Sequence, residues 1–217
     1  MTEERSQARE RSVEERLEEI ARDVRACTRC DLWRTRTQAV PGEGNPQADV
    51  MVIGEAPGYH EDRQGRPFVG AAGQFLNELL GRAGLRREEV FITNVVKCRP
   101  PGNRDPLPDE IASCAPYLEA QLAAIRPRVI VTLGRYSMAR WFPNEKISRV
   151  HGQARRVGEY VVVPMYHPAA ALHQPALKEL VEKDFDQLGE ILRRVRAEAR
   201  PPTDEAPEER PHQMRLF

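Results

Sequence analysis

Short runs of apolar, β-branched residues alternate along the chain with longer stretches in which apolar positions recur every three or four residues. The runs are typical of buried strands in a parallel sheet, and the longer stretches are typical of amphipathic helices. Strands are predicted at residues 50–53, 90–96, 128–134 and 155–165 (broken at Gly158), and helices at 71–84, 109–125, 135–142 and 176–197. This alternation predicts an α/β fold, a three-layer α/β/α sandwich around a central, mostly parallel four-stranded sheet.

The two ends of the chain differ from this core. Residues 1–26 are rich in charge and place apolar residues from Val13 to Val24 at four- and three-residue spacing, which predicts an amphipathic helix packed on the core. Residues 27–198 form the predicted domain. Residues 199–217 combine prolines with charges, a composition that stays disordered on its own.

Length and charge limit the kinds of protein this chain can be. The 217 residues suit one domain with appendages, and no apolar run approaches the ~18 residues of a membrane span. We therefore expect a monomeric cytoplasmic protein without a membrane segment. Lys plus Arg and Asp plus Glu balance at 33 each, which at first argues against a nucleic-acid partner. Both ends are acidic, however, so residues 27–198 keep a small basic excess that permits a basic face.

Four cysteines, Cys27, Cys30, Cys98 and Cys114, begin with a close pair. A cytoplasmic chain rarely keeps disulfides, so four thiolates on one metal centre is a stronger hypothesis than scattered structural thiols. Zinc and an iron–sulfur cluster both accept four cysteines, and spacing alone does not choose between them.

Polar residues stand at the carboxyl ends of three predicted strands. Gly54-Glu55-Ala56-Pro57-Gly58 follows the first strand, Asn94 lies near the end of the second, and His167 follows the last. Taken singly, each residue has an ordinary structural explanation. The asparagine could be a turn residue whose hydrogen bonds are all made, and the histidine could be a structural loop residue. The carboxylates could be solvated at the surface. Open α/β sheets, however, place their ligands at this edge. Together with Phe68 these residues could grip a flat polar heterocycle, which predicts a ligand site.

The same residues match the motifs of one enzyme family, in order along the chain. The match runs from about Cys27 to Leu192 and includes Gly54-Glu55-Ala56-Pro57-Gly58, Gly65-Arg66-Pro67-Phe68-Val69-Gly70, Thr93-Asn94-Val95-Val96-Lys97-Cys98-Arg99-Pro100-Pro101 and Tyr166-His167-Pro168-Ala169. The chain thereby resembles a family four uracil-DNA glycosylase, the iron–sulfur branch of that superfamily. The resemblance implies excision of uracil from single- or double-stranded DNA, which leaves an abasic site for base excision repair. It also implies a [4Fe–4S] cluster on Cys27, Cys30, Cys98 and Cys114.

The resemblance further implies how the base is held. Uracil must leave the DNA stack before its glycosidic bond can be reached. Phe68 is expected to stack on the flipped base, and Asn94 to bind its N3–O4 edge. Glu61 is expected to close the site against the 5-methyl group of thymine.

A second implied set of residues serves the chemistry. Loss of uracil leaves a cationic sugar and a negative charge on the base. His167 and backbone N–H groups of Gly54, Ala56 and Gly58 are expected to stabilise the charge that grows on O2. Glu55 is expected to position the water or to steady the cationic sugar.

Four further residues are expected to contact the DNA. Leu172, with Ala169–Ala171, is expected to fill the gap left by the flipped base, with a buried leucine at a helix start as the alternative. The cluster is expected to pin the proline-rich loop and to present Lys97, Arg99 and Arg104 to phosphates.

The chain ends in Gln213-Met214-Arg215-Leu216-Phe217. This ending is similar to the peptides with which bacterial repair proteins bind the sliding clamp. A disordered tether with Gln213, Leu216 and Phe217 as anchors suits such docking, and an incidental tail is the alternative.

Two other functions are compatible with the sequence. One is a non-catalytic DNA- or nucleotide-binding module that keeps the sheet and the cluster, and the presence of Asn94 and His167 argues against it. The other is a broader specificity in which hypoxanthine or xanthine is also removed. The width of the base site decides that question, and sequence does not give it.

Overall fold

The centre of the molecule is a six-stranded sheet with the strand order β1-β3-β2-β4-β6-β5. A computed structural model describes residues 11–172 and 174–198. The strands are β1 Glu43–Gly44, β2 Val50–Gly54, β3 Phe91–Asn94, β4 Val129–Leu133, β5 Arg155–Val157 and β6 Tyr160–Met165. The four inner strands are parallel, and each edge strand pairs antiparallel with its neighbour.

The predicted fold class is confirmed, but the predicted count of four strands is wrong. Strands β5 and β6 are the two halves of the predicted segment that breaks at Gly158. Strand β1 lies in a turn-rich connector with no strand pattern. It forms because Glu43 and Gly44 pair with β3 across the sheet, a non-local contact that a local pattern does not report.

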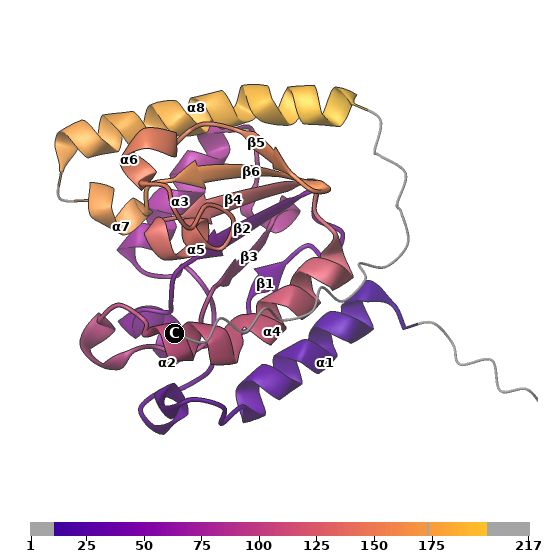
Figure 1. Cartoon of the computed structure of the whole chain (residues 1–217), viewed down its shortest axis with the longest axis vertical. Helices are drawn as coiled ribbons and strands as arrows, with labels where there is room; N and C mark the ends of the chain where they lie inside the picture. Colours follow the sequence, from indigo (N-terminus) through magenta and orange to yellow (C-terminus); the bar gives the residue numbers. More distant parts are fainter. Residues whose placement is uncertain (1–10, 173, 199–217) are drawn as a thin grey trace, which may run out of the picture.

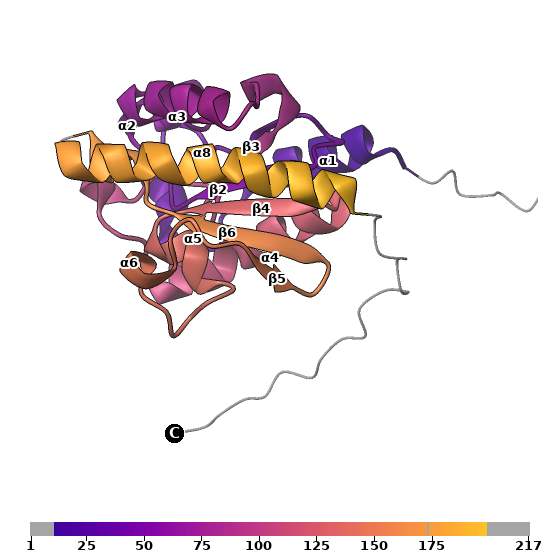
Figure 2. The ribbon, with the colours of Figure 1, turned by 90° about the horizontal axis from the view of Figure 1, so that it is seen from above.

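Helices cover both faces of the sheet, as Figures 1 and 2 show. Helices α3, α7 and α8 lie on one face, and α1, α4, α5 and α6 lie on the other. The α-helices are α1 Val13–Ala26, α2 Tyr59–Gln64, α3 Ala71–Arg82, α4 Pro108–Ile125, α5 Arg135–Ala139, α6 Ile147–Val150, α7 Pro168–Ala171 and α8 Pro175–Ala197, and three short 3₁₀ helices are η1 Asp31–Arg34, η2 Arg87–Glu89 and η3 Pro101–Asn103.

The apolar run of β2 is explained by burial on both faces of the sheet. Successive side chains of a strand point to opposite faces. Val50 and Val52 accordingly join the core beneath α3 and α8, whereas Met51 and Ile53 join the core beneath α4. All five residues of β2 are buried, so no position favours a polar side chain.

Helix α1 begins at Val13 because the preceding Ser12 caps it. The Ser12 hydroxyl accepts the N–H of Glu15, and the Glu15 carboxylate accepts the N–H of Ser12. The helix packs against α4 (Figure 1). The first ten residues of the predicted N-terminal helix and the tail 199–217 lie outside the described residues. Within the described part, no helix has the length and apolar character needed to cross a membrane.

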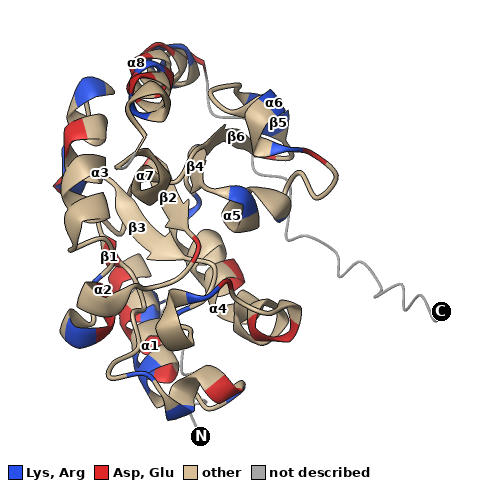
Figure 3. Cartoon of the chain, turned by 90° about the vertical axis from the view of Figure 1, so that its left-hand side faces the viewer, with Lys and Arg blue, Asp and Glu red and all other residues tan. Residues whose placement is uncertain are grey.

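Charged side chains lie on the outer elements and not in the middle of the sheet. Figure 3 shows both signs of charge along α8, whereas β2 and β3 carry neither. Some of these charges connect elements: Arg82 of α3 pairs with Asp186 of α8 at 2.6 Å. Exposed pairs of this kind contribute little stability each, so the apolar layers carry the fold.

Candidate functional site

The carboxyl ends of the inner strands meet at one edge of the sheet. Gly54 of β2 is the register partner of Asn94 of β3. Strands β4 and β6 lie on the other side of β2. The N–H of Gly134, which directly follows β4, donates to the carbonyl of Met165 at the end of β6. His167 lies two residues after Met165. The edge therefore brings together Gly54, Phe68, Asn94 and His167, which we call the strand-end site.

Close packing at Gly54 shows how tightly the site is built. A Cβ added to this glycine would lie 2.6 Å from Phe68 Cζ and closer still to Asn94 Oδ1, whereas ordinary contacts begin at 3.4 Å. Only glycine lets the ring and the amide approach the backbone this closely. The sequence motif around Gly54 thus has a direct steric reason.

Asn94 is 1% exposed, and its side-chain oxygen Oδ1 accepts no hydrogen bond from the described residues. Buried polar atoms in proteins nearly always have a partner, and leaving one without costs about 1–3 kcal/mol. The alternative of a turn residue with all its hydrogen bonds made is therefore excluded. An oxygen in this state is suited to accept a hydrogen bond from a ligand.

Phe68 stands in the site with a strained backbone, at φ +50°. Its ring stacks on His167 with centroids 5.6 Å apart and planes 26° apart. Arg87 holds the strained segment, because its guanidinium donates to the carbonyls of Pro67 at 2.6 Å and Phe68 at 3.2 Å. No motif in the sequence indicated Arg87, which lies in η2 and reaches back to the segment before α3. Strain that is held in this way is typical of functional sites.

His167 is a neutral hydrogen-bond donor at pH 7. Its Nδ1 accepts the N–H of Ala169 at 3.2 Å, so the proton of the neutral ring is on Nε2. Burial lowers the pKa of His167 to about 4, although the nearby Glu61 carboxylate acts in the opposite direction. The ring therefore offers an N–H without a full positive charge.

Glu61 is engaged in three hydrogen bonds to the backbone. Its carboxylate accepts the N–H groups of Gly58, Val69 and Gly70 at 3.2, 2.8 and 3.0 Å. These bonds tie the start of α2, a helix that we did not predict, to the turn after Phe68. The prediction that the Gly58 N–H binds the ligand is wrong, because Glu61 already occupies it.

Glu55 is half-buried at the beginning of the turn after β2. Burial and the charge of Asp105 raise the pKa of Glu55 to about 7, while Arg135 acts to lower it. Asp105 and Arg135 form an ion pair with each other. Arg135 was not predicted as a site residue, although its position directly after β4 was a usable signal. A carboxylate with a pKa near 7 is well suited to proton transfer at neutral pH.

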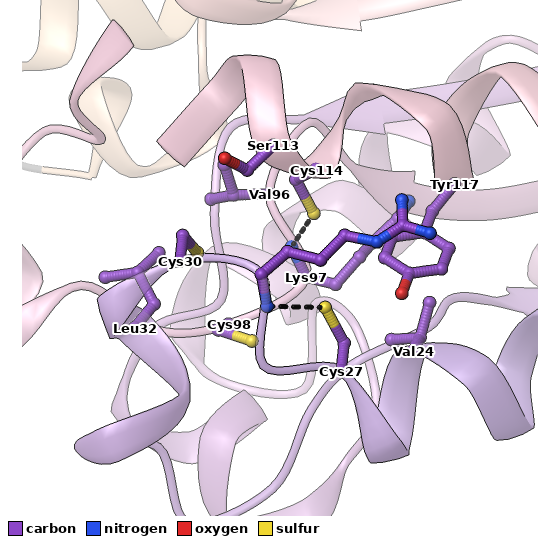
Figure 4. Close-up of a pocket in the computed structure, with 11 residues that line it drawn as sticks. Val24, Cys27, Cys30, Leu32, Val96, Lys97, Cys98, Ser113, Cys114 and Tyr117 are labelled. Atoms are coloured by element: carbon purple, nitrogen blue, oxygen red, sulfur yellow. Dashed lines mark hydrogen bonds between the residues drawn. The ribbon is translucent and has the colours of Figure 1, made fainter. Parts of the chain in front are cut away.

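A second candidate site lies beside the strand-end site. The thiols of Cys27, Cys30, Cys98 and Cys114 line one cavity (Figure 4). All four are free cysteines. Among residues 11–172 and 174–198, no three His, Cys, Asp or Glu side chains are arranged as ligands of a single metal ion. Burial raises the pKa of Cys30, Cys98 and Cys114, the last to about 11. Without a bound cation these groups stay protonated and unreactive.

Each of the four sulfurs nevertheless accepts an N–H group. The donors are the Arg29 backbone to Cys27 at 3.5 Å, the Leu32 backbone to Cys30, Arg36 Nη1 to Cys98 at 3.0 Å, and the Lys97 backbone to Cys114 at 3.3 Å. Figure 4 shows two of these bonds as dashed lines. An N–H group directed at every sulfur would stabilise negative charge there.

Lys97 is buried, so its predicted contact with a phosphate is wrong. The side chain is 1% exposed. Its Nζ donates to Thr93 Oγ1, the Asn94 carbonyl and Gln121 Oε1 at 2.5, 2.8 and 2.7 Å. These three acceptors match the three donors of an ammonium group. Burial lowers the pKa of Lys97 to about 7.

The other predicted DNA contacts lie at the surface. Arg104 forms a two-bond ion pair with Glu110, at 2.6 and 2.9 Å, so a phosphate would compete with that pair. Arg99 lies 5.2 Å from the ring centroid of Tyr59, and its phosphate contact stays a prediction. Leu172 is 40% exposed, which excludes the alternative of a buried leucine.

Comparison with known proteins places these features in context. A sequence model of the uracil DNA glycosylase superfamily matches residues 41–194. The chain is 51% identical over 187 residues to the type-4 uracil-DNA glycosylase of Archaeoglobus fulgidus. The aligned region covers 82% of this chain and 94% of the relative. It is 50% identical to the type-4 uracil-DNA glycosylases of Sulfurisphaera tokodaii (185 residues, 81% and 84%) and Saccharolobus solfataricus (186 residues, 81% and 86%).

Proposed function

The chain belongs to the type-4 branch of the uracil-DNA glycosylase superfamily, and we propose that it removes uracil from DNA by hydrolysing the N-glycosidic bond. One observation carries the proposal. An unpartnered buried amide oxygen, a stacking ring and a neutral imidazole donor lie together at the carboxyl edge of the sheet. These are the groups that a uracil flipped out of DNA requires. The product is an abasic site, the starting point of base excision repair.

Asn94 distinguishes uracil from cytosine. Its Oδ1 accepts N3–H of uracil, and its side-chain NH₂ donates to O4. Cytosine has an acceptor at N3 and a donor at the 4-position, so both hydrogen bonds would meet the wrong partner. Phe68 stacks on the face of the base. Glu61, which fixes the turn beside this ring, also closes the site against the 5-methyl group of thymine.

The chemistry needs stabilisation of two opposite charges. As the bond from C1′ to N1 breaks, its electron pair stays on uracil and the sugar becomes cationic. His167 Nε2–H donates to O2, helped by the backbone N–H group of Ala56, and such a preorganised donor is worth about 3–4 kcal/mol in other enzymes. Ionised Glu55 steadies the sugar or orients the water, whose oxygen bonds to C1′ and whose proton is released.

The DNA contacts follow from the surface around this edge. Leu172 enters the space that the flipped base vacates, where an apolar side chain replaces the lost stacking. Arg99 binds a phosphate near the loop that follows β3. The exposed position of Leu172 and the half-exposed position of Arg99 support these roles.

We also propose that Cys27, Cys30, Cys98 and Cys114 hold a [4Fe–4S] cluster. The shared cavity and an N–H donor at every sulfur support the fit, because hydrogen bonds to the ligating sulfurs are a regular feature of such sites. When bound, the cluster supplies iron–thiolate bonds that cross-link distant segments of the chain. Arg36 extends this link, since its second nitrogen donates to the last turn of α1 at 2.7 Å.

An excision assay tests the proposed function. Single- and double-stranded oligonucleotides with one uracil are incubated with the protein, and abasic sites are then cleaved by alkali. We expect cleavage at uracil and none at cytosine or thymine in the same position, while an arm with hypoxanthine or xanthine tests broader specificity. An Asn94→Ala protein prepared identically controls for contaminating enzyme. Binding of uracil DNA without cleavage would identify a non-catalytic module and overturn the proposal.

Partners and compartment complete the proposal. Four free cysteines suit the reducing cytoplasm, and we propose that the protein works there as a monomer. Gln213, Leu216 and Phe217 lie outside the described residues, and we propose that they dock on the sliding clamp. Deletion of residues 213–217 should then abolish capture by the clamp and leave excision from short oligonucleotides intact. Loss of excision would instead show that the folded domain needs residues 213–217.

A further inference from the structure

Lys97 is a buried basic residue to which the proposed excision chemistry assigns no task. Taking an ammonium group out of water is costly, and here no carboxylate offsets the cost through a hydrogen bond, because all three acceptors are neutral oxygens. The position of this lysine, between the strand-end site and the cysteine cavity, suggests what the ammonium contributes.

The peptide group between Asn94 and Val95 is held at both of its polar ends. Lys97 holds the carbonyl, and Gly54 holds the N–H. The carbonyl of Asn94 accepts from Lys97 Nζ at 2.8 Å. The N–H at the other end of the same peptide group, that of Val95, donates to the carbonyl of Gly54 at 3.0 Å. Since both polar groups of this peptide are fixed, the Asn94 backbone cannot rotate freely, and its side-chain amide keeps one direction.

The remaining contacts of the ammonium make it rigid. Gln121 of α4 and Thr93 both accept from Nζ, and both also donate to the carbonyl of Pro41, at 2.7 and 2.9 Å. The lysine is thus held by β3, by α4 and by the connector before β2. Three acceptors in fixed positions leave the ammonium one orientation.

The backbone of the same residue reaches the cysteine cavity. Its N–H donates to Cys114 Sγ at 3.3 Å, and its carbonyl accepts from the N–H of Val40 at 2.7 Å. Cys98 is the next residue in the chain. A single residue therefore joins the predicted cluster ligands to the peptide that carries the base-reading amide.

We propose that Lys97 is a positioning residue for base recognition, which fixes the Asn94 peptide and ties its orientation to the cysteine cavity. The inference rests on the proposed function of the strand-end site. It assigns the ammonium to the alignment of Asn94 and not to phosphate binding or to general stability.

The first test replaces the ammonium and keeps the length of the side chain, in Lys97→Met. Single-turnover excision should slow by about 10- to 100-fold, the range expected for loss of a hydrogen bond to a charged group. The enzyme concentration that gives half the maximal rate should change little, and the visible absorbance of the cluster should be retained. Lys183→Met, at an exposed position of α8, is the matched control and should excise at the wild-type rate.

A double-mutant cycle separates positioning from a merely structural role. If Lys97 acts through Asn94, the Lys97→Met change should slow an Asn94→Ala enzyme by no more than about 2-fold, because contacting residues are energetically coupled. An equal slowing in both backgrounds would overturn the inference. Should Lys97→Met not fold, Gln121→Met removes one acceptor of the ammonium and enters the same cycle.

Failure of the proposed function would be visible separately. If the wild-type protein excises no uracil, the proposed function fails. The role of Lys97 is then tested by measuring DNA binding. Preference for a uracil over a cytosine oligonucleotide should fall in Lys97→Met, and the change should have no further effect in the Asn94→Ala background. An unchanged preference would overturn the inference.

Discussion

The packing at Gly54 permits a sharp test of the strand-end site with a single added methyl group. In Gly54→Ala the new Cβ would lie 2.6 Å from Phe68 Cζ and 2.8 Å from Cε2, with Asn94 Oδ1 still closer. To reach an ordinary contact of 3.4 Å the ring must retreat by about 0.8 Å, and the amide must move further. Misplacement of about 1 Å in an active site can cost about 100-fold in rate. We expect a loss of that size in single-turnover excision of uracil.

The assay needs a control for the general effect of replacing glycine. Gly81 lies in α3, and a Cβ added there meets no atom within 4 Å. Gly81→Ala should therefore keep full activity and gain about 0.5–1 kcal/mol in stability, as expected when alanine replaces glycine in a helix. For Gly54→Ala we expect a cost in stability of about 1–3 kcal/mol from overpacking. Excision at the wild-type rate by folded Gly54→Ala would refute the assignment of Phe68 and Asn94 to the base.

Three further predictions concern individual groups. The kcat/KM for uracil DNA should rise with pH through about 7, because only ionised Glu55 is active while His167 stays neutral above its pKa of about 4; Glu55→Gln should flatten the profile. Arg87→Met should slow single-turnover excision about 10-fold by releasing the strained backbone of Phe68. Cys114→Ser should lower both the visible absorbance of the cluster and the melting temperature, since metal-binding energy contributes to folding.

Each of these predictions has an outcome that contradicts it. A wild-type profile without a step near pH 7 would remove Glu55 from the chemistry. Unchanged excision by Arg87→Met, measured beside the exposed neighbour Arg86→Met as control, would show that packing alone holds Phe68. Full absorbance and an unchanged melting temperature in Cys114→Ser would exclude this cysteine as a cluster ligand.

The positions of Asn94 and His167 followed from the sequence because a general rule covers them. Buried strands have recognisable runs, and the carboxyl ends of parallel strands share one edge. The end of β3 was less well predicted. Val95 and Val96 continue the apolar run, yet the strand stops at Asn94, because their N–H groups bond to consecutive carbonyls, those of Gly54 and Glu55, whereas a regular parallel ladder uses every second residue. That competition arises only after β2 has been placed.

The role of Lys97 could not be predicted from the sequence. A lysine beside a cysteine and an arginine is usually solvated, and phosphate binding is then the natural hypothesis. Its burial depends on Gln121, which α4 brings from 24 residues further along the chain, and on the connector at Pro41. The same holds for Arg87, whose acceptors are the carbonyls of Pro67 and Phe68 and the side chains of Asn77 and Glu43, brought together from separate parts of the chain. Contacts of this kind become visible only in three dimensions.

The distribution of the strand-end site over the chain also sets when this protein can first act during its own synthesis. Gly54, Phe68 and Asn94 belong to the first half of the chain, whereas His167 follows β6, which pairs only with β4 and β5. Chains emerge from the ribosome with the N-terminus first, and contacts distant in sequence form late. A nascent chain that ends before residue 167 contains Phe68 and Asn94 but lacks the imidazole of His167. The order of these residues along the chain thus means that the four groups of the strand-end site are first present together once residue 167 has been made.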